Sequence, residues 1–375
     1  MDALPSISDL ERRAKRRLPS FAWVYLESGT GDDRARDLNR EALAAVRFRP
    51  QFLKGPLEPS TTTTLFGASY DTPIGIAPVG LTGLIWPGAD RYLAQTASRR
   101  NIPYVLSTVG TASPEQAGEW AGGNGWFQLY PPRKPDIRSD LLDRARDAGL
   151  KVLVVTADVP AQSRRERQRK ARLRVPPKID ARLVATAAIK PAWTRALAKE
   201  GMPRFRALEA YVDEASMKNT AGFVGANLGG TLSWEYLDAL RSQWDGPLVV
   251  KGILDPDDAA SCVEHGADGV WVSNHGGRQL DGAIASIDAL GAIVDVVAQR
   301  VPILFDSGIR DGLDVARALA LGADFCFAGR PFMFGLGALG EHGAEHALDI
   351  LHDGLITTMH QVGVEQLSEL SKRLA

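Results

Sequence analysis

ILFDSGIRDGLDVARALALGADFCFAGR (303–330) contains two short apolar runs, one on each side of a helix-like segment. The runs ILFDSG (303–308) and FCFAGR (325–330) have the length and composition of buried strands. Strand, helix and strand in this order are typical of two parallel strands joined by a helical crossover. The stretch therefore predicts the repeating unit of an α/β protein.

The same unit recurs from residue 72 onward, where further β-rich runs alternate with helix-like segments. Those runs are IGIAP (74–78), YVLST (104–108), WFQLY (126–130), VLVVTAD (152–158), LVVKG (248–252) and GVWVSNH (269–275). Eight parallel strands in succession predict a closed (β/α)8 TIM barrel. Polar side chains such as Gln128, Asp158 and His275 end the runs. A barrel brings those ends to one mouth, whereas a doubly wound open sheet spreads them along a crevice, so we favour the barrel.

Two segments lie outside this repeat, within an expected single domain over residues 1–375. Residues 1–71 form a predicted N-terminal helical lead-in, and the barrel is expected over residues 72–375. Residues 159–223 form a long insertion after the fourth strand, where a connection of that length is usually a lid, a binding element or disordered.

Residues 178–215 of the insertion mix aliphatic side chains with Lys, Arg and Trp193, as does a helix that lies on a membrane surface. The hydrophobic stretch is short and rich in Ala, however. We therefore favour a lid packed over the barrel mouth, and keep peripheral membrane contact through 178–215 as the alternative.

The charge balance and the cysteines narrow the class of protein. With 44 basic and 45 acidic side chains, the chain has no overall field that attracts nucleic acid or an anionic membrane. Cys262 and Cys326 lie far apart in apolar settings that suit buried free thiols in a reducing compartment. Neither a signal h-region nor an apolar run of transmembrane length is evident. We expect a cytoplasmic protein, or one bound peripherally to the inner face of the membrane.

VSNHGGRQLDG (272–282) carries the strongest chemical signal in the sequence. His275 ends a predicted strand, two glycines follow it, and Arg278 lies three residues further on. Glycines let a ligand approach the backbone closely, and a base beside a cation suits the oxidation of an anionic substrate. A single strand-end histidine is more often structural, but the arginine and the position at the barrel mouth favour catalysis.

SNHGGRQ (273–279) resembles the signature of the FMN-dependent L-2-hydroxy acid oxidases and dehydrogenases. The resemblance extends over nearly the whole chain, from LPSFAWVYLESG (18–29) through WFQLY, TADVP, RRE and VVKG to DSGIRDGLDVARALALGAD (306–324) and GRPF. It implies an enzyme that binds FMN and oxidises an L-2-hydroxy acid to the 2-keto acid. In such enzymes a histidine takes a proton from the substrate while two electrons pass to the flavin, which makes His275 the catalytic base.

The resemblance assigns three further residues to the surroundings of His275. Asp158 matches the carboxylate that pairs with the histidine and stabilises its charged form. Tyr130 and Tyr25 match tyrosines whose hydroxyls contact the carboxylate and hydroxyl groups of the substrate. Without the resemblance, both tyrosines would pass for core aromatics.

Arg165 and Arg278 match the two arginines that hold the substrate carboxylate, because a guanidinium offers paired donors. Arg165 stands in the basic run SRRERQRKAR, in which a single arginine would otherwise face solvent. The chain departs from the family pattern here, since Ser163 replaces a usual glycine and Gln168 a usual aspartate. This departure leaves the path of the loop open.

For FMN, the resemblance places Lys251 at the N1 and O2 edge of the ring, where its charge stabilises the reduced flavin. Polar strand ends and the backbone after the first strand are expected to face the ring: Ala77, Pro78, Val79, Gly80, Ser107, Gln128, Thr156 and Ser273. Barrels commonly bind phosphate after strands seven and eight, where the matching residues are Asp306, Gly308, Arg310, Gly329 and Arg330. Asp306 is expected on a ribityl hydroxyl, and the two arginines near the phosphate.

Two positions bear on the substrate and the electron acceptor. Gly80 stands where many oxidases of the family carry alanine, which favours a dehydrogenase that passes electrons to a quinone, with oxygen as the alternative acceptor. Val109 stands where glycolate oxidases carry tryptophan, which favours an aromatic or branched acid. GLTGLIWPGAD (80–90) and AWTRALAKEGMP (192–203) also resemble the (S)-mandelate dehydrogenase branch. The resemblance further implies a homotetramer.

Other classes of protein make different predictions. HGAEH (342–346) fits a zinc-site pattern and GLGALG (335–340) a dinucleotide-binding pattern, but neither has the expected context, and we expect no metal. A different FMN barrel, such as an isopentenyl diphosphate isomerase, should lack the histidine and arginine of SNHGGR. A non-catalytic flavin-binding barrel should lose the base, whereas this chain keeps both the base and the phosphate cradle.

Overall fold

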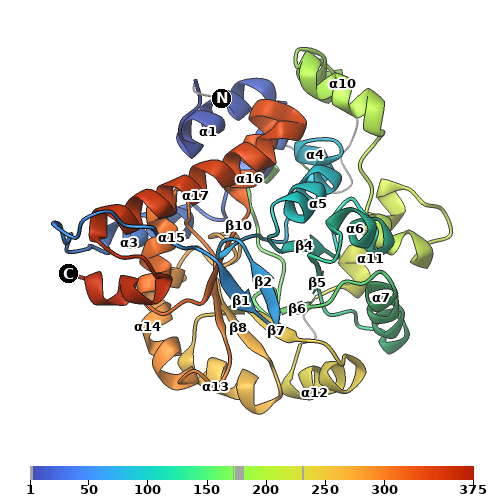
Figure 1. The fold of residues 1–375 in the computed structure, drawn as a ribbon. Helices are drawn as coiled ribbons and strands as arrows, with labels where there is room; N and C mark the ends of the chain where they lie inside the picture. Colours follow the sequence, from blue (N-terminus) through green and yellow to red (C-terminus); the bar gives the residue numbers. More distant parts are fainter. Residues whose placement is uncertain (1–2, 172, 174–180, 230–231) are drawn as a thin grey trace.

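Eight parallel strands close into a barrel in the computed structural model, which describes residues 3–171, 173, 181–229 and 232–375 (Figure 1). Each strand pairs with the next, and the last pairs with the first. This closed sheet confirms the predicted (β/α)8 TIM barrel, and each predicted run overlaps one strand. The strands are β3 (Ile74–Ile76), β4 (Tyr104–Ser107), β5 (Gly125–Leu129), β6 (Leu153–Thr156), β7 (Leu248–Ile253), β8 (Gly269–Val272), β9 (Ile303–Phe305) and β10 (Phe325–Ala328).

Helices cover the outside of the barrel, and several begin at polar caps that the sequence supplies. The Ser113 and Gln116 side chains form a capping box, and the side chains of Asp255 and Asp311 accept hydrogen bonds from helical N–H groups. The barrel helices are α4 (Thr82–Ile85), α5 (Ala89–Arg99), α6 (Pro114–Ala121), α7 (Pro135–Asp147), α12 (Trp234–Gln243), α13 (Pro256–Glu264), α14 (Ser286–Val297), α15 (Gly312–Ala320), α16 (Arg330–Leu339), η2 (Gly340–His342), α17 (Gly343–Val362) and η3 (Leu367–Arg373).

Large apolar side chains fill the barrel, and a hairpin closes the end at which its strands begin. The hairpin joins β1 (Thr63–Leu65) to β2 (Ala68–Tyr70), and the Phe66 ring at its turn lies 5.7 Å from the Trp126 ring near the start of β5. The interior side chains are Val105, Trp126, Val154, Val249, Trp271, Leu304, Phe325 and Phe327. Because the hairpin covers the ends where the strands begin, a ligand reaches the opposite ends.

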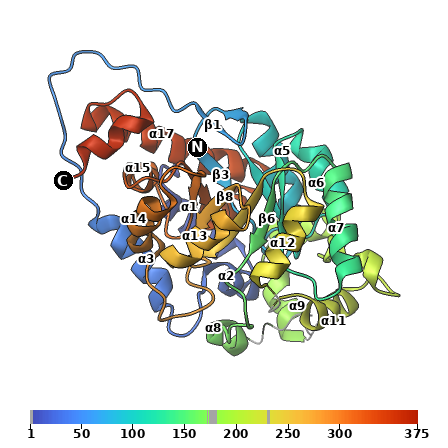
Figure 2. The ribbon, with the colours of Figure 1, turned by 90° about the horizontal axis from the view of Figure 1, so that it is seen from below.

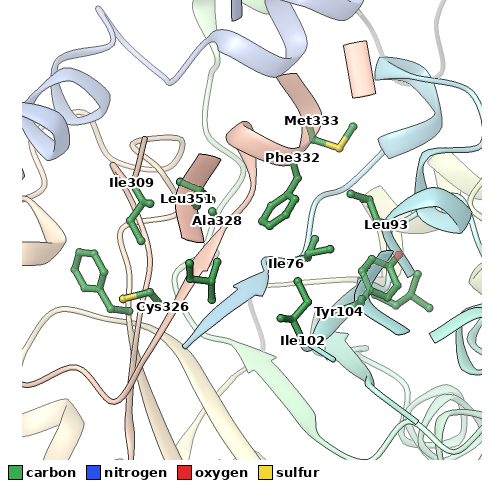
Figure 3. Packing of buried hydrophobic residues seen from close by; sticks show 14 of the residues in the cluster. Ile76, Leu93, Ile102, Tyr104, Ile309, Cys326, Ala328, Phe332, Met333 and Leu351 are labelled. Carbon is green, nitrogen blue, oxygen red and sulfur yellow. The ribbon is translucent and has the colours of Figure 1, made fainter. Parts of the chain in front are cut away.

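A second apolar layer lies between the strands and the outer helices. Figure 3 shows part of it, with Cys326 and Ala328 of β10 near Phe332 and Met333 of α16 and Leu351 of α17. The free thiol of Cys326 is fully buried in this layer, as expected from its apolar surroundings in the sequence. The layer holds the helices on the barrel, so the strand ends form a fixed platform.

The lead-in and the insertion lie against the barrel beside its mouth. The lead-in contains α1 (Ile7–Arg17), α2 (Ser20–Glu27) and α3 (Arg34–Ala45). Figure 2 shows α8, α9 and α11 of the insertion gathered on the same side of the barrel as α2. The helices of the insertion are α8 (Glu166–Lys170), α9 (Ala181–Ala188), α10 (Pro191–Glu200), η1 (Arg206–Tyr211) and α11 (Met217–Asn227).

The helix α10 lies in the segment predicted to be a lid or a membrane contact, of which residues 178–180 fall outside the described residues. Its Trp193 is buried, with its ring centroid 5.7 Å from that of Phe21 in an edge-to-face contact and its Nε1 donating to the Ile85 carbonyl at 3.1 Å. Trp193 therefore anchors α10 to the lead-in and to α4.

Candidate active site

A cavity of about 930 Å³ opens at the C-terminal ends of the strands. Its wall is formed by strand-end loops together with parts of the lead-in and the insertion. Most residues singled out from the sequence line it: Tyr25, Ala77, Pro78, Val79, Gly80, Gln128, Tyr130, Thr156, Arg165, Lys251, His275, Arg278, Asp306, Gly308, Arg310, Gly329 and Arg330. The fold thus brings segments from across the whole chain to one place.

Three of the predicted site residues, Ser107, Asp158 and Ser273, stand behind this wall instead of lining it. Each of them hydrogen-bonds to a side chain that does line the cavity. Contact of Ser107 and Ser273 with FMN stays a prediction, since both serines lie directly beside cavity-lining side chains. A polar side chain at a strand end can point along the sheet toward its neighbour as well as into the mouth.

His275 follows β8 in a tight turn with a left-handed backbone, at φ 59°. Its N–H donates to Ser273 Oγ at 3.0 Å, and the next two residues, Gly276 and Gly277, also have positive φ angles, of 64° and 73°. A left-handed conformation is unfavourable for a residue with a Cβ and easy for glycine. The turn needs both glycines, and it places the strained histidine in the cavity wall.

The two ring nitrogens of His275 have different partners. Its Nδ1 lies 2.8 Å from Asp158 Oδ1, and its Nε2 lies 3.4 Å from the Tyr130 hydroxyl. A carboxylate at Nδ1 fixes the ring orientation and the position of its proton. The Nε2 atom is then the nitrogen available to a ligand in the cavity.

The charges around Asp158 keep this pair polarised. Burial acts to raise the pKa of Asp158, but the nearby His275 and Lys251 outweigh burial and hold that pKa below its usual value. An ionised Asp158 stabilises His275 when the ring is protonated. Burial, and then the charge of Asp158, raises the pKa of Tyr130 well above its usual value, so Tyr130 stays a neutral donor.

The two arginines expected to hold a carboxylate both line the cavity. Burial, and then the charge of Arg165, lowers the pKa of Arg278 to about 10. Arg278 donates to the Tyr25 carbonyl at 2.9 Å, and its guanidinium lies 5.0 Å from the centre of the Tyr25 ring. Within the described residues, neither arginine forms an ion pair with a carboxylate of the protein. The pair is therefore free to bind an anion.

Lys251 lies in a buried polar network at the ends of β7, β8 and β9. Its Nζ lies 2.7 Å from Asp306 Oδ2 and donates to Ser273 Oγ at 2.7 Å, while Ser273 donates to Asp306 Oδ1 at 2.5 Å. Ser307, which the sequence analysis did not single out, also donates to Asp306 Oδ1, at 2.7 Å, and accepts from Gly276 N–H at 3.0 Å. The network ties the ammonium group to the turn that carries His275.

A second polar chain crosses β4, β5 and β6. Ser107 Oγ donates to Gln128 Oε1 and Gln128 Nε2 donates to Thr156 Oγ1, both at 2.8 Å. The strand register explains the first link, since Ser107 pairs with Gln128; in the second link the Gln128 amide reaches Thr156, two residues beyond its register partner Val154. These two hydrogen bonds hold the amide of Gln128 in one orientation. A fixed amide presents defined donors and acceptors to a ligand.

Two buried guanidiniums mark the other end of the cavity, after β9 and β10. Burial lowers the pKa of Arg310 to about 10, and burial followed by the charges of Arg310 and Arg278 lowers that of Arg330 well below its usual value. Arg330 donates to three backbone carbonyls, at 2.9 to 3.1 Å. Gly308 has φ 100° and faces the Asn39 carbonyl so closely that a Cβ would lie 2.7 Å from it.

These features fit FMN. Among the described residues, Arg310 and Arg330 form no ion pair, so their buried positive charge is available to a phosphate. Lys251 supplies a charge at the base of the cavity, and the backbone of residues 77–80 supplies its floor beside β3. The volume of about 930 Å³ lies in the range of pockets that enclose a small cofactor or ligand.

The sequence analysis missed how the insertion holds the lead-in. Arg167 forms ion pairs with Glu27, at 2.6 Å, and with Asp33, and Gln168 Nε2 donates to Ser28 Oγ at 3.1 Å. The departure at Gln168 thus forms a buried contact with the lead-in. The opposite charges of ESGTGDD and the basic run were the available signal.

Most of the apolar wall of the cavity was not predicted from the sequence. Val109 was expected beside the substrate, and the structure adds Phe205 of the insertion, Leu81 and Ile85 at the two ends of α4, and the face of α11. Apolar and small residues four or three apart in AGFVGANL were the signal in the sequence. That signal predicts an amphipathic helix, and it does not say which face meets the cavity.

The two dismissed motifs lie in ordinary helical positions. His342 precedes α17 and is exposed, while the Nε2 of buried His346 lies 2.9 Å from the Leu4 carbonyl. The glycines of GLGALG belong to α16 and η2, which pack under α17.

Known proteins match this chain over nearly its whole length. Residues 14–375 match the family described as FMN-dependent dehydrogenase. An L-lactate dehydrogenase of Caulobacter sp. (strain K31) is 37% identical to this chain over 99% of this chain and 98% of its own. An L-lactate dehydrogenase of Pseudomonas aeruginosa (strain LESB58) is also 37% identical, over 97% and 96%.

Solved structures show the same likeness over the whole chain. The monotopic membrane protein (S)-mandelate dehydrogenase has a TM-score of 0.93 at 34% identity, over 99% of this chain and 98% of that chain. A mandelate oxidase has a TM-score of 0.83 at 33% identity, over 99% and 97%. The chain therefore belongs to the FMN-dependent dehydrogenase family, as an FMN-dependent enzyme that oxidises 2-hydroxy acids.

Proposed function

We propose that the enzyme oxidises an L-2-hydroxy acid with an aromatic or branched side chain to the 2-keto acid, and that the electrons pass on to a quinone-like acceptor. One observation carries the proposal: His275, with its Nδ1 held by Asp158, shares a cavity with the guanidiniums of Arg165 and Arg278. FMN, when bound, accepts the two electrons that the substrate loses.

The side chains of this cavity divide the work of the reaction. Arg165 and Arg278 bind the substrate carboxylate and so hold the hydroxyl-bearing carbon near His275. The Nε2 of His275 takes a proton from the substrate, and Asp158 stabilises the imidazolium that results. Tyr130, kept neutral by its raised pKa, donates a hydrogen bond to the substrate oxygen.

Lys251, the Gln128 chain and the loop at residues 77–80 are proposed to hold the FMN ring, and Arg310 and Arg330 its phosphate. Lys251 is the buried cation of this set, so it supplies the positive charge that a ring gaining electrons requires. Tyr25 donates to the Gly80 carbonyl at 3.0 Å, which ties the lead-in to that loop.

The size of the acid is inferred from the apolar wall. Leu81, Ile85, Val109 and Phe205 line the cavity, so a hydrocarbon side chain has apolar contacts available. Two solved relatives are named for mandelate, an aromatic acid. Relatives at 37% identity are named for L-lactate, which makes lactate the alternative substrate.

The acceptor is inferred from Gly80 and from the names of relatives. A Cβ at Gly80 would lie 2.9 Å from Val109 Cγ2 and 3.5 Å from the Tyr25 hydroxyl, so the neighbouring side chains are packed for glycine. The relatives with 37% identity are named dehydrogenases. Use of oxygen with release of hydrogen peroxide is the alternative, because one solved relative is named an oxidase.

We further propose peripheral contact with the inner face of the membrane through residues 178–215, of which 178–180 lie outside the described residues. Ile189 and Met202, which flank α10, are 72% and 54% exposed. The (S)-mandelate dehydrogenase with TM-score 0.93 is described as a monotopic membrane protein. No described helix is long and apolar enough to span a bilayer.

The expected homotetramer stays a prediction, which sedimentation of the detergent-free protein tests.

The proposal is tested by mixing the yellow protein anaerobically with L-mandelate, L-lactate or glycolate and then admitting air. We expect mandelate to bleach the flavin band fastest, and the colour to return slowly in air and quickly with a quinone. Rapid recovery in air would establish an oxidase. Flavin that no 2-hydroxy acid bleaches would instead indicate a non-catalytic flavin-binding barrel.

A further inference from the structure

The helix α11 presents one face to the cavity, and that face contains a glycine. Ala221, Val224, Gly225 and Leu228 follow the spacing of a single helix face, and all four line the cavity. Gly225 is exposed, and a Cβ built on it has no heavy atom of the described residues within 4 Å. The apolar wall is thus open at Gly225, where the other positions of the same face carry side chains.

The chemistry of the gap is hydrocarbon in character. Its neighbours on α11 are an alanine, a valine and a leucine, and the cavity is lined further by Phe205 and Val109. A group placed there gains from the burial of apolar surface, while a charged group would find no partner on this face of the helix.

We propose that Gly225 sets the size of the side chain that the enzyme accepts on a 2-hydroxy acid, because its missing side chain leaves the space for an aromatic ring or a branched chain. The inference rests on the proposed function, since it takes the cavity around His275 as the substrate site. A larger residue at position 225 would occupy the volume that an aromatic or branched acid requires. A small acid does not need this volume and should still bind.

The chain offers a matched control three residues away. Gly222 lies in the same helix and is exposed, as Gly225 is, and a Cβ built on it also has no heavy atom of the described residues within 4 Å, but Gly222 does not line the cavity. Leucine has a higher helix propensity than glycine, so both Gly225→Leu and Gly222→Leu should preserve α11. The two variants differ in whether the new side chain enters the cavity.

The test measures kcat/KM of the full-length FMN-loaded enzymes for L-lactate, L-2-hydroxyisocaproate and L-mandelate, with an artificial electron acceptor. For Gly225→Leu we expect the ratio of kcat/KM for mandelate to kcat/KM for lactate to fall by at least roughly 10-fold, since one methylene of difference in an apolar pocket already changes kcat/KM by roughly 10- to 200-fold. Gly222→Leu should keep the wild-type ratio, and Gly225→Ala should lower it by less than Gly225→Leu.

A binding measurement separates fit from chemistry. The keto acids pyruvate and phenylglyoxylate are titrated into the oxidised enzymes, and their Kd values follow from the perturbed flavin spectrum. Gly225→Leu should weaken binding of phenylglyoxylate and leave that of pyruvate close to wild type. An unchanged preference in Gly225→Leu, or an equal loss in Gly222→Leu, would overturn the role of Gly225 while leaving the proposed reaction intact. A wild-type enzyme that oxidises lactate but neither larger acid would also overturn the role of Gly225. A flavin that no acid reduces would instead refute the proposed function itself.

Discussion

The two ends of the cavity are built in different ways. The proposed phosphate end, defined by Gly308, Arg310, Gly329 and Arg330, comes from two short loops within the single stretch 303–330. The proposed acid end, defined by Tyr25, Arg165 and Arg278, takes one residue each from the lead-in, the insertion and the loop after β8. The phosphate end thus takes its residues from contiguous barrel loops, although Arg330 also donates to the Leu26 and Ser28 carbonyls of the lead-in. The acid end, by contrast, exists only once distant segments have docked.

The two ends nevertheless share a backbone contact. The Ser28 carbonyl accepts from Arg278 at 3.3 Å and from Arg330 at 3.1 Å. Correct placement of the lead-in therefore supports both arginines. The comparison predicts that substitutions separate into those that lose substrate and those that lose cofactor, with the lead-in affecting both.

The largest effect is expected at His275. His275→Ala should keep the FMN and slow flavin reduction by several orders of magnitude, because general base catalysis alone contributes roughly 10²- to 10⁴-fold. Anaerobic stopped-flow absorbance measures the rate. Reduction at the wild-type rate would show that another group removes the proton.

Exchanging one arginine at each end tests the comparison directly. Arg278→Met should weaken substrate binding by about 2–5 kcal/mol, as the loss of one partner from a buried charge pair does, and should retain FMN. Arg330→Met should instead release FMN on dialysis. KM values and the ratio of flavin to protein absorbance distinguish the two variants. Loss of flavin from both variants would show that the two ends of the cavity do not act separately.

A smaller effect is expected from Asp158 through pH. The folded pKa of Asp158 is lowered, so its contribution to stability is present above its unfolded pKa, about 3.9, and is lost as the pH falls through the folded value. Asp158→Asn should reduce the free energy of unfolding at pH 7 and flatten the fall of that free energy below about pH 4. Urea unfolding at pH 7 and pH 3 measures both. An equal pH slope in the two proteins would contradict this coupling.

The smallest effect is expected from the contact between the insertion and the lead-in. Arg167 is 38% exposed, so solvent weakens its ion pairs with Glu27 and Asp33, and Arg167→Met should cost no more than about 1 kcal/mol. We expect a modestly raised KM and faster proteolysis near residues 28–36. Arg164→Met, at a side chain that is 77% exposed, is the control, and equal proteolysis of both variants would argue against a specific contact.

Prediction from the sequence worked best where a motif is continuous. The runs of β-rich sequence located all eight strands, and SNHGGRQ located the turn that carries His275. The strand-end positions of Ser107 and Ser273 were also predicted, whereas the partners of their side chains were not. Those partners depend on the register with the neighbouring strand, as the pairing of Ser107 with Gln128 shows.

The apolar side of the cavity was the least predictable part. Phe205 and the face of α11 lie in a connection whose length signals a functional element without specifying where it packs. An amphipathic pattern indicates that one face is covered, and many surfaces can cover it.

Strand periodicity and strand-end loops are local properties, so the barrel, its mouth and the residue types gathered there could be predicted from the sequence. No local pattern shows that Nδ1 of His275 faces Asp158, that Arg278 and Arg330 share the Ser28 carbonyl, or that the apolar wall is open at Gly225. Those features depend on distances between segments far apart in the chain, which the packing of the lead-in and the insertion on the barrel sets.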